Sequence, residues 1–140
     1  MSKVAVVYWS GTGNTEAMAD AVAKGARAAG ASAELFSASD FSAAKAAGFD
    51  AFALGCPAMG SESLEDSEFE PVYDAIKGTL AGRKVALFGS YGWGGGEYLD
   101  TWKSQAEDAG VNVVSAVAVN VEPEDDALGE LKALGQKLAQ

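Results

Sequence analysis

The sequence has 140 residues, of which 49% are hydrophobic, with 17 glycines and 3 prolines. This composition fits a compact globular protein of one domain and argues against a disordered chain. The formal net charge is -10 at pH 7 and the pI is about 4.3. Nucleic acids and anionic membrane surfaces would therefore repel the protein, whereas basic proteins would attract it.

Cysteine and histidine usage narrows the chemistry further. The single cysteine, Cys56, cannot form an internal disulfide, which fits a reducing compartment. The sequence contains no histidine, so the usual general base and metal ligand is missing and much hydrolytic chemistry is excluded. No run approaches about 18 apolar residues and the N-terminal residues show no cleavage pattern, so we expect a cytoplasmic protein that does not enter a membrane.

The pattern of apolar residues predicts five strands and five helices. Apolar runs without strict alternation are typical of strands covered on both faces of a parallel sheet, and apolar residues three or four positions apart are typical of helices. In chain order, the predicted elements are a strand from Val4 to Tyr8, a helix through Met18, Val22 and Ala26, a strand from Ala33 to Phe36, a short helix from Ser42 to Ala47, a strand from Ala51 to Cys56, a helix through Phe69, Val72 and Ile76, a strand from Val85 to Gly89, a helix through Leu99, Trp102 and Ala106, a strand from Val111 to Val121, and a helix through Leu128, Leu131, Leu134 and Leu138.

Glycines and charged residues mark the helix ends. Gly30, Gly78 and Gly110 follow helical patterns at the places where a left-handed cap would sit. Pro123 and the acids after it predict the start of the last helix, and Lys137 lies toward its end, as the helix dipole favours.

Strands that alternate with helices predict right-handed βαβ units and a doubly wound sheet. Ligands of such sheets bind beyond the carboxyl ends of the strands. Three connections therefore become candidates for a binding site: Ser10 to Thr15, Pro57 to Asp66, and Ser90 to Glu97.

The loop after the first strand is suited to a phosphate group. A glycine-rich turn into a helix directs backbone N–H groups and the positive helix end toward one point. Ser10, Thr12 and Thr15 add hydroxyl donors, while Gly11 and Gly13 permit close approach. Because the loop has no lysine or arginine, it favours a terminal monophosphate over a nucleoside triphosphate with its metal ion. Taken alone, the loop could also be a plain strand-to-helix turn with an N-cap.

Three other phosphate patterns do not fit. Counted from Gly11, the second glycine of a Walker loop would fall at Glu16, and the loop has no lysine. Glu16 replaces the third glycine of the dinucleotide fingerprint. Glu62 stands where a tyrosine-phosphatase loop starting at Cys56 would need arginine.

Three motifs together resemble those of flavodoxins. VYWSGTGNTE (Val7 to Glu16) resembles their phosphate loop, whereas CPAMGSESLEDSEFEP (Cys56 to Pro71) and LFGSYGWGGGE (Leu87 to Glu97) resemble the two flavin-ring loops of the short-chain branch. The similarity covers essentially the whole chain, without the insertion that long-chain members carry in the fifth strand. It implies an α/β, flavodoxin-like doubly wound sheet of five parallel strands in the order 2-1-3-4-5, with helices on both faces, as a single domain over residues 1–140.

The resemblance implies noncovalently bound FMN and a role for each matching position. Met59 and Trp93 would cover the two faces of the isoalloxazine ring, as a polarizable thioether and a large aromatic face can do. Glu62 would accept a hydrogen bond from flavin N3–H, and the peptide at Gly60 would turn its carbonyl toward flavin N5. Met59 and Trp93 could instead be ordinary packing residues, and Glu62 a solvated surface acid.

The cofactor-binding positions implied by the resemblance are Ser10, Gly11, Thr12, Gly13, Asn14 and Thr15 for the phosphate, and Pro57, Ala58, Met59, Gly60, Ser61, Glu62, Ser90, Tyr91, Gly92, Trp93 and Gly94 around the ring. No metal site and no catalytic residue are expected. Trp9, Trp102 and Cys56 are expected to pack structurally.

The acids Glu62, Glu65, Asp66, Glu68 and Glu70 form a segment without a base. Such a run is usually a solvated face, but charges beside a flavin ring would oppose the addition of an electron. The resemblance implies a low-potential one-electron carrier that cycles FMN mainly between semiquinone and hydroquinone and replaces ferredoxin between redox proteins. The implied partners are redox proteins with basic docking patches, such as flavodoxin or ferredoxin reductases and low-potential oxidoreductases, and the protein is expected to be a monomer.

Two alternatives use related folds. A small FMN-dependent NAD(P)H or quinone reductase would need room above the ring for hydride transfer, which Met59 and Trp93 would fill. A phospho-receiver domain would need aspartates after strands one and three and a lysine after strand five. Those places hold WS (9–10), CP (56–57) and NV (120–121), so the sequence argues against this alternative.

Overall fold

The structure, a computed structural model, describes residues 3–9, 14–46, 48–56, 69–76, 78, 80, 83–91, 97–120 and 125–139. All the predicted strands and helices are present in these ranges, with ends shifted by one or two residues wherever the prediction gave bounds. The strands are β1 (Lys3–Tyr8), β2 (Ser32–Ser37), β3 (Ala51–Gly55), β4 (Lys84–Tyr91) and β5 (Asn112–Asn120). The helices are α1 (Asn14–Ala28), the 3-10 helix η1 (Ala38–Asp40), α2 (Ala43–Ala46), α3 (Phe69–Ile76), α4 (Glu97–Asp108) and α5 (Asp125–Ala139).

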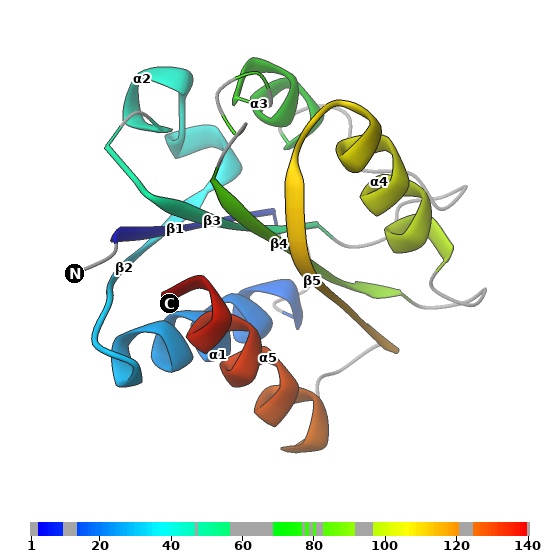
Figure 1. The fold of residues 1–140 in the computed structure, drawn as a ribbon. Helices are drawn as coiled ribbons and strands as arrows, with labels where there is room; N and C mark the ends of the chain where they lie inside the picture. Colours follow the sequence, from blue (N-terminus) through cyan, green and yellow to red (C-terminus); the bar gives the residue numbers. More distant parts are fainter. Residues whose placement is uncertain are drawn as a thin grey trace.

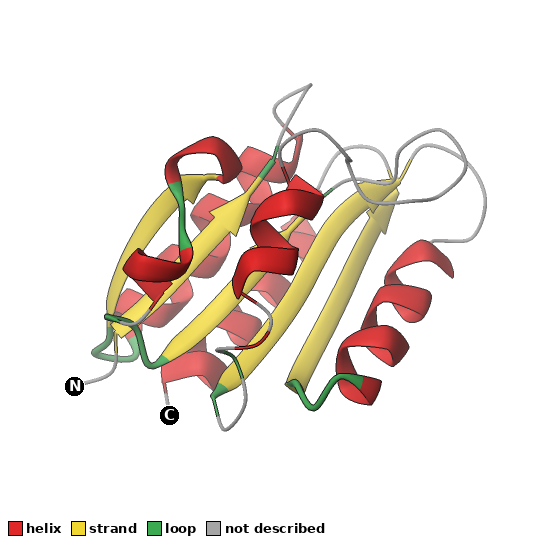
Figure 2. Ribbon diagram, turned by 90° about the horizontal axis from the view of Figure 1, so that it is seen from above, coloured by secondary structure: helices red, strands yellow, loops and turns green. Residues whose placement is uncertain are grey.

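The five strands form one parallel sheet in the order β2-β1-β3-β4-β5. Their arrows point the same way in Figure 2. This confirms both the doubly wound topology and the strand order that the resemblance implied. From β1 the chain passes to one side for β2 and to the other side for β3, so the carboxyl ends of β1 and β3 form the topological switch point of the sheet.

Helices cover both faces of the sheet (Figure 1). Helices α1 and α5 lie on one face, which we call the α1–α5 face, and α2, α3 and α4 lie on the other, the α3–α4 face. Strand β1 contributes to both cores, since Val4 and Val6 pack on the α1–α5 face and Ala5 and Val7 pack on the α3–α4 face, all fully buried. Burial on both faces explains why the strands read as continuous apolar runs.

Helices α1 and α5 approach each other through their backbones. A Cβ atom added at Gly25 would lie 2.0 Å from the Lys132 carbonyl oxygen, and one added at Gly135 would lie 2.1 Å from the Val22 carbonyl oxygen. Glycine inside a helix costs about 1 kcal/mol relative to alanine. The close contact explains why two glycines nevertheless occupy helix interiors.

Two of the three predicted glycine caps are confirmed. Gly30 after α1 has a φ of 95° and Gly110 after α4 has a φ of 90°. The N–H groups of the following residues, Ala31 and Val111, each donate to the carbonyl five positions earlier at 3.0 Å, which completes a Schellman motif at both helix ends. The prediction for Gly78 is wrong, because this residue has 3-10 rather than left-handed conformation.

Candidate functional site

The pairing of β3 with its two neighbours, β1 and β4, ends at nearly the same level on both sides. β1 pairs with β3 up to Tyr8 and Gly55, and β3 pairs with β4 up to Gly55 and Phe88. One further bond follows on each side: the Trp9 N–H donates to the Gly55 carbonyl at 3.0 Å, and the Cys56 N–H donates to the Phe88 carbonyl at 3.1 Å. The switch point therefore has a regular, hydrogen-bonded edge.

Strand β4 continues beyond this edge. It pairs with β5 as far as Tyr91 and Asn120, which is three residues past Phe88. At about 3.3 Å per residue, β4 and β5 rise about 10 Å above the end of β3. The resulting step separates the connection that follows β3 from the connection that follows β4.

The step corrects one prediction about the fourth strand. Ser90 and Tyr91 were expected in the connection to α4, but they belong to β4, where they pair with Val119 and Asn120. The connection to α4 is accordingly residues 92–96. The sequence did not reveal the extension, because it depends on the partner strand β5 being equally long.

The first turn of α1 meets the requirements of a phosphate site. The helix begins at Asn14, so Asn14 and Thr15, predicted in the loop, form its first turn. The first four N–H groups of a helix have no partner within it and form its positive end. The Thr15 side chain is buried, with 1% exposure. A helix start that carries no basic side chain and buries Thr15, at the switch point, fits the phosphate of FMN.

The pKa of Tyr8, at the end of β1, reflects the negative charges near the first turn of α1. Burial raises the pKa of the half-buried Tyr8 phenol above its ordinary value of 10.0, and the negative charges of Glu16, Asp20 and Asp40 raise this pKa further. All three acids therefore contribute negative potential at the end of β1.

Gly55 and Phe88 form a contact below the step that sequence reasoning did not select. A Cβ atom at Gly55 would lie 2.3 Å from the Cε2 and Cζ atoms of the Phe88 ring, which is fully buried. A glycine within a buried strand often marks such a close approach, and this was the available signal.

The predicted cofactor residues divide into two sets. The backbones of Asn14, Thr15, Ser90 and Tyr91 are described and lie at the carboxyl edge of the sheet. Residues 10–13, 57–62 and 92–94, which include the predicted ring-covering Met59 and Trp93, lie outside the described residues. The structural roles expected for Cys56 and Trp102 are confirmed, since both are buried, and Trp9 packs half-buried against the core.

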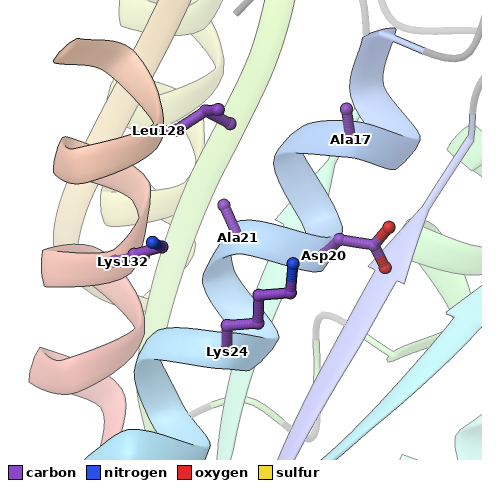
Figure 3. A pocket seen from close by; sticks show the side chains of 6 residues that line it. All are labelled: Ala17, Asp20, Ala21, Lys24, Leu128 and Lys132. Carbon is purple, nitrogen blue, oxygen red and sulfur yellow. The ribbon is translucent and has the colours of Figure 1, made fainter. Parts of the chain in front are cut away.

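An open groove lies between α1 and α5, on the N-terminal side of their glycine contact (Figure 3). Its volume is about 270 Å³ and its lining residues are Ala17, Asp20, Ala21, Lys24, Leu128 and Lys132. The groove contains two lysines, whereas none of the connections at the carboxyl edge has a basic residue. It is therefore chemically different from the site at the step.

The described residues provide neither a metal site nor a membrane-spanning helix. In the described ranges, no group of three or more His, Cys, Asp or Glu side chains could hold a metal ion. None of the helices in the described part of the chain has the length and apolar character needed to cross a membrane.

Comparison with known proteins identifies the family. The sequence model of the flavodoxin family matches residues 6–134. The chain is 49% identical to the flavodoxin of Megasphaera elsdenii over 137 residues, which covers 98% of each chain. It is 41% identical to the flavodoxin of Clostridium beijerinckii over 134 residues, which covers 96% of this chain and 97% of that one.

The fold agrees with a solved structure. The solution structure of the two-electron reduced flavodoxin of Megasphaera elsdenii superposes with a TM-score of 0.90 at 50% identity, over 97% of this chain and 98% of that chain. Flavodoxins are electron-transfer proteins that use FMN. With the parallel sheet, the first turn of α1 that carries no basic residue, and these matches, the chain belongs to the flavodoxin family, binds FMN and carries electrons.

Proposed function

We propose that this chain is a low-potential one-electron carrier that acts in place of ferredoxin between other redox proteins. Its FMN would cycle mainly between semiquinone and hydroquinone, and the protein, a single monomeric domain, would turn over no substrate of its own. The observation that carries this proposal is the complete absence of lysine and arginine from the connections after the five strands, residues 9–13, 38–42, 56–68, 92–96 and 121–124.

Uncharged donors would hold the phosphate. Thr15, with its buried side chain, and the N–H groups of the first α1 turn support this assignment, together with Ser10 and Thr12 in the preceding connection. Backbone and hydroxyl donors bind a phosphate without adding a positive charge. The negative charge of the phosphate would thus remain largely uncompensated and would add to the cost of reducing the flavin.

Acids close to the ring would lower the midpoint potential of the last reduction step. The connection after β3 contains Glu62, Glu65, Asp66 and Glu68, and Glu70 follows in α3. A single carboxylate about 10 Å away raises the energy of an added electron by roughly 0.4 kcal/mol even at the dielectric constant of water. For a one-electron couple this corresponds to roughly 18 mV, because a tenfold change is about 59 mV.

The distribution of charge would orient partners. Acids accumulate after the strands, whereas four basic residues lie at the opposite edge: Lys3 and Lys84 begin strands, and Arg27 and Lys137 lie in the last turns of α1 and α5. Lys45 in α2 is an exception, because its Nζ donates to the Asp40 carbonyl after β2. A basic patch on a redox protein would be attracted to the carboxyl edge, where the flavin lies in this proposal. Such steering raises the rate of encounter more than the lasting affinity.

A reductive titration of the FMN-loaded protein tests the proposal. We expect two resolved one-electron steps, with a blue intermediate and a second midpoint potential well below the first. Added salt should raise the second midpoint, because it screens the distant carboxylates. A single two-electron step would contradict the proposal, and steady NADH consumption by the isolated protein would favour the reductase alternative.

Glu62→Gln provides a sharper version of this test. Removing its charge should weaken FMN binding and raise the second midpoint potential by roughly 20 mV. Glu107→Gln is the matched control, since Glu107 is exposed near the end of α4, toward the opposite edge of the sheet. If the two variants have equal second midpoint potentials, Glu62 does not lie close to the flavin ring.

A further inference from the structure

Three aromatic rings join α3 to α4. The indole of Trp102 in α4 meets the ring of Phe69 edge to face, with centroids 5.4 Å apart and an interplanar angle of 89°. It meets Tyr73 in the same way at 5.7 Å and 86°. All three are buried, at 2%, 1% and 8% exposure for Trp102, Phe69 and Tyr73, and such perpendicular contacts are favourable for aromatic pairs. We call this group the aromatic seam.

The position of the aromatic seam in the chain is its important property. Phe69 is the first residue of α3, and α3 follows the connection that leaves β3. Trp102 lies in the second turn of α4, which follows the connection that leaves β4. The seam thus ties together the two helix starts at which the proposed ring-binding connections end.

The strand ends of the same connections are fixed independently. The Cys56 N–H donates to the Phe88 carbonyl at 3.1 Å, where β3 meets β4. Strand β4 continues from there to Tyr91, paired with β5. Hydrogen bonds between strands thus fix the point at which each connection leaves the sheet, and side-chain volume in the aromatic seam sets the spacing of the helices at their ends. Helices α3 and α4 lie over the same face of the sheet (Figure 1), so the volume between them determines how far apart they stand.

The indole nitrogen shows that ring size is what matters at Trp102. Its Nε1 atom is buried and has no hydrogen-bond partner among the residues that the structure describes. Burying an unpaired donor is costly, and a phenylalanine or leucine would avoid that cost. A tryptophan that keeps an unpaired N–H is best explained by the volume of its ring.

We propose that Trp102 is a positioning residue for the flavin: through Phe69 and Tyr73, it sets the spacing between the two connections that enclose the isoalloxazine ring. The inference rests on the proposed placement of the ring between these connections. Trp102 itself does not need to touch the cofactor. A smaller side chain would let α3 and α4 approach, and the oxidised and reduced rings, which differ in charge and shape, would then be bound with altered relative affinity.

Trp102→Leu and Trp102→Phe test this role in the FMN-loaded protein. A shift in spacing near a binding site has large effects on affinity, so Trp102→Leu should weaken the binding of oxidised FMN about tenfold or more. The same variant should change the separation of the two midpoint potentials. Trp102→Phe retains a ring against Phe69 and Tyr73 and should show a smaller change in the same direction, which keeps the test decisive if the leucine variant folds poorly.

Leu134→Ala in α5 is the control for general destabilisation. Leu134 is 1% exposed and packs in the core of the opposite, α1–α5 face. Loss of stability alone affects all redox states of the bound flavin alike, so this variant should leave the midpoint potentials unchanged.

The outcomes separate the two proposals. Unchanged affinity and potentials in both Trp102 variants, or equal potential shifts in Leu134→Ala, would overturn the positioning role while wild-type flavin chemistry stays intact. Failure of the wild-type protein to show two one-electron steps would overturn the proposed function instead. Shifts in the midpoint potentials that are larger in Trp102→Leu than in Trp102→Phe, each measured against the wild type, would support the positioning role.

Discussion

The two faces of the sheet are packed by different means. On the α1–α5 face, two helices meet backbone to backbone at Gly25 and Gly135, and most of the core side chains of α1 are alanine or valine. On the α3–α4 face, large rings fill the space, including Phe52, Phe69 and Trp102. One face is fixed by contact between main chains and the other by the volume of side chains.

This difference in packing matches the two roles that we propose for the carboxyl edge, which are binding the phosphate and binding the flavin ring. Helix α1 supplies the first turn that we assign to the phosphate, and a backbone contact leaves its position little freedom. Helices α3 and α4 begin after the connections that we assign to the ring, and ring volume can be altered in small steps by substitution. We infer that phosphate binding depends on a rigid contact, whereas the flavin-ring environment can be adjusted from within the core.

The largest expected effect comes from removing a ring on the α3–α4 face. Phe52 is fully buried, with ring centroids of Phe41 and Phe49 at 6.4 and 6.5 Å and the Arg83 guanidinium 5.7 Å from its own centroid. Phe52→Ala should lower the free energy of unfolding by about 3–5 kcal/mol, as for other buried phenylalanines. Phe36→Ala, at a half-buried position of the same cluster, should cost clearly less in urea unfolding. Equal losses would mean that volume does not dominate this face.

The α1–α5 contact should respond to a single added methyl group. Gly135→Ala introduces overpacking of about 1–3 kcal/mol or more, which outweighs the gain of about 1 kcal/mol in helix propensity. Because the added Cβ would lie 2.1 Å from a backbone carbonyl oxygen, the upper end of this range applies, and we expect a net loss of about 2 kcal/mol in the free energy of unfolding. Gly129→Ala in the same helix is the control, because no atom lies within 4 Å of its added Cβ. It should stabilise the protein by about 1 kcal/mol, and a loss there would show that the Gly135 effect is not specific to the contact.

The helix caps should behave alike on both faces. Gly30 ends α1 and Gly110 ends α4, both with positive φ and with open space around an added Cβ. Replacing either with alanine should cost about 1 kcal/mol through backbone strain alone. Gly78→Ala should cause no such loss, since Gly78 lacks the left-handed conformation. Thermal unfolding of the three variants measures these losses of stability. A marked difference between Gly30→Ala and Gly110→Ala would indicate that packing contributes as well.

The smallest effect concerns Tyr8 and appears only at high pH. Because the folded protein raises the pKa of Tyr8 above 10.0, the unfolded chain releases this proton first. The contribution to stability is complete below pH 10 and is lost as the pH rises through the folded pKa. Between about pH 9 and 11, unfolding free energies of wild type should therefore fall more steeply than those of Tyr8→Phe. Parallel curves would argue against burial and negative potential at this phenol.

Most of the fold could be predicted from the sequence, because its signals are local. The apolar runs of β1 and β3 and the spacing of Leu131, Leu134 and Leu138 in α5 depend only on neighbours in the chain. The wrong cap at Gly78 arose because a glycine after a helix permits, but does not require, a left-handed residue. The length of β4 depended on pairing with β5, which no local pattern encodes.

The site was less accessible to sequence reasoning than the fold. The glycine-rich motif around Ser10 to Thr15 pointed to the first turn of α1, where Thr15 is indeed buried. Gly25, Gly55 and Gly135 were not selected, although glycine within a helix or strand is a recognised sign of close approach. The aromatic seam joins residues 29 and 33 positions apart, and only the folded arrangement brings Trp102 to Tyr73 and Phe69.

The glycine contact between α1 and α5 has a consequence for how the protein reaches its folded state. The two helices are the first and last in the described chain, and neither can cover its face of the sheet without the other. A polypeptide emerging from the ribosome would hold β1 and α1 for most of its synthesis with the apolar side of that helix exposed to water. Contacts between distant segments form slowly, since the intervening chain must first be ordered. Completion of the α1–α5 face is thus expected to be a late event, governed by the arrival of α5 with Leu131 and Gly135.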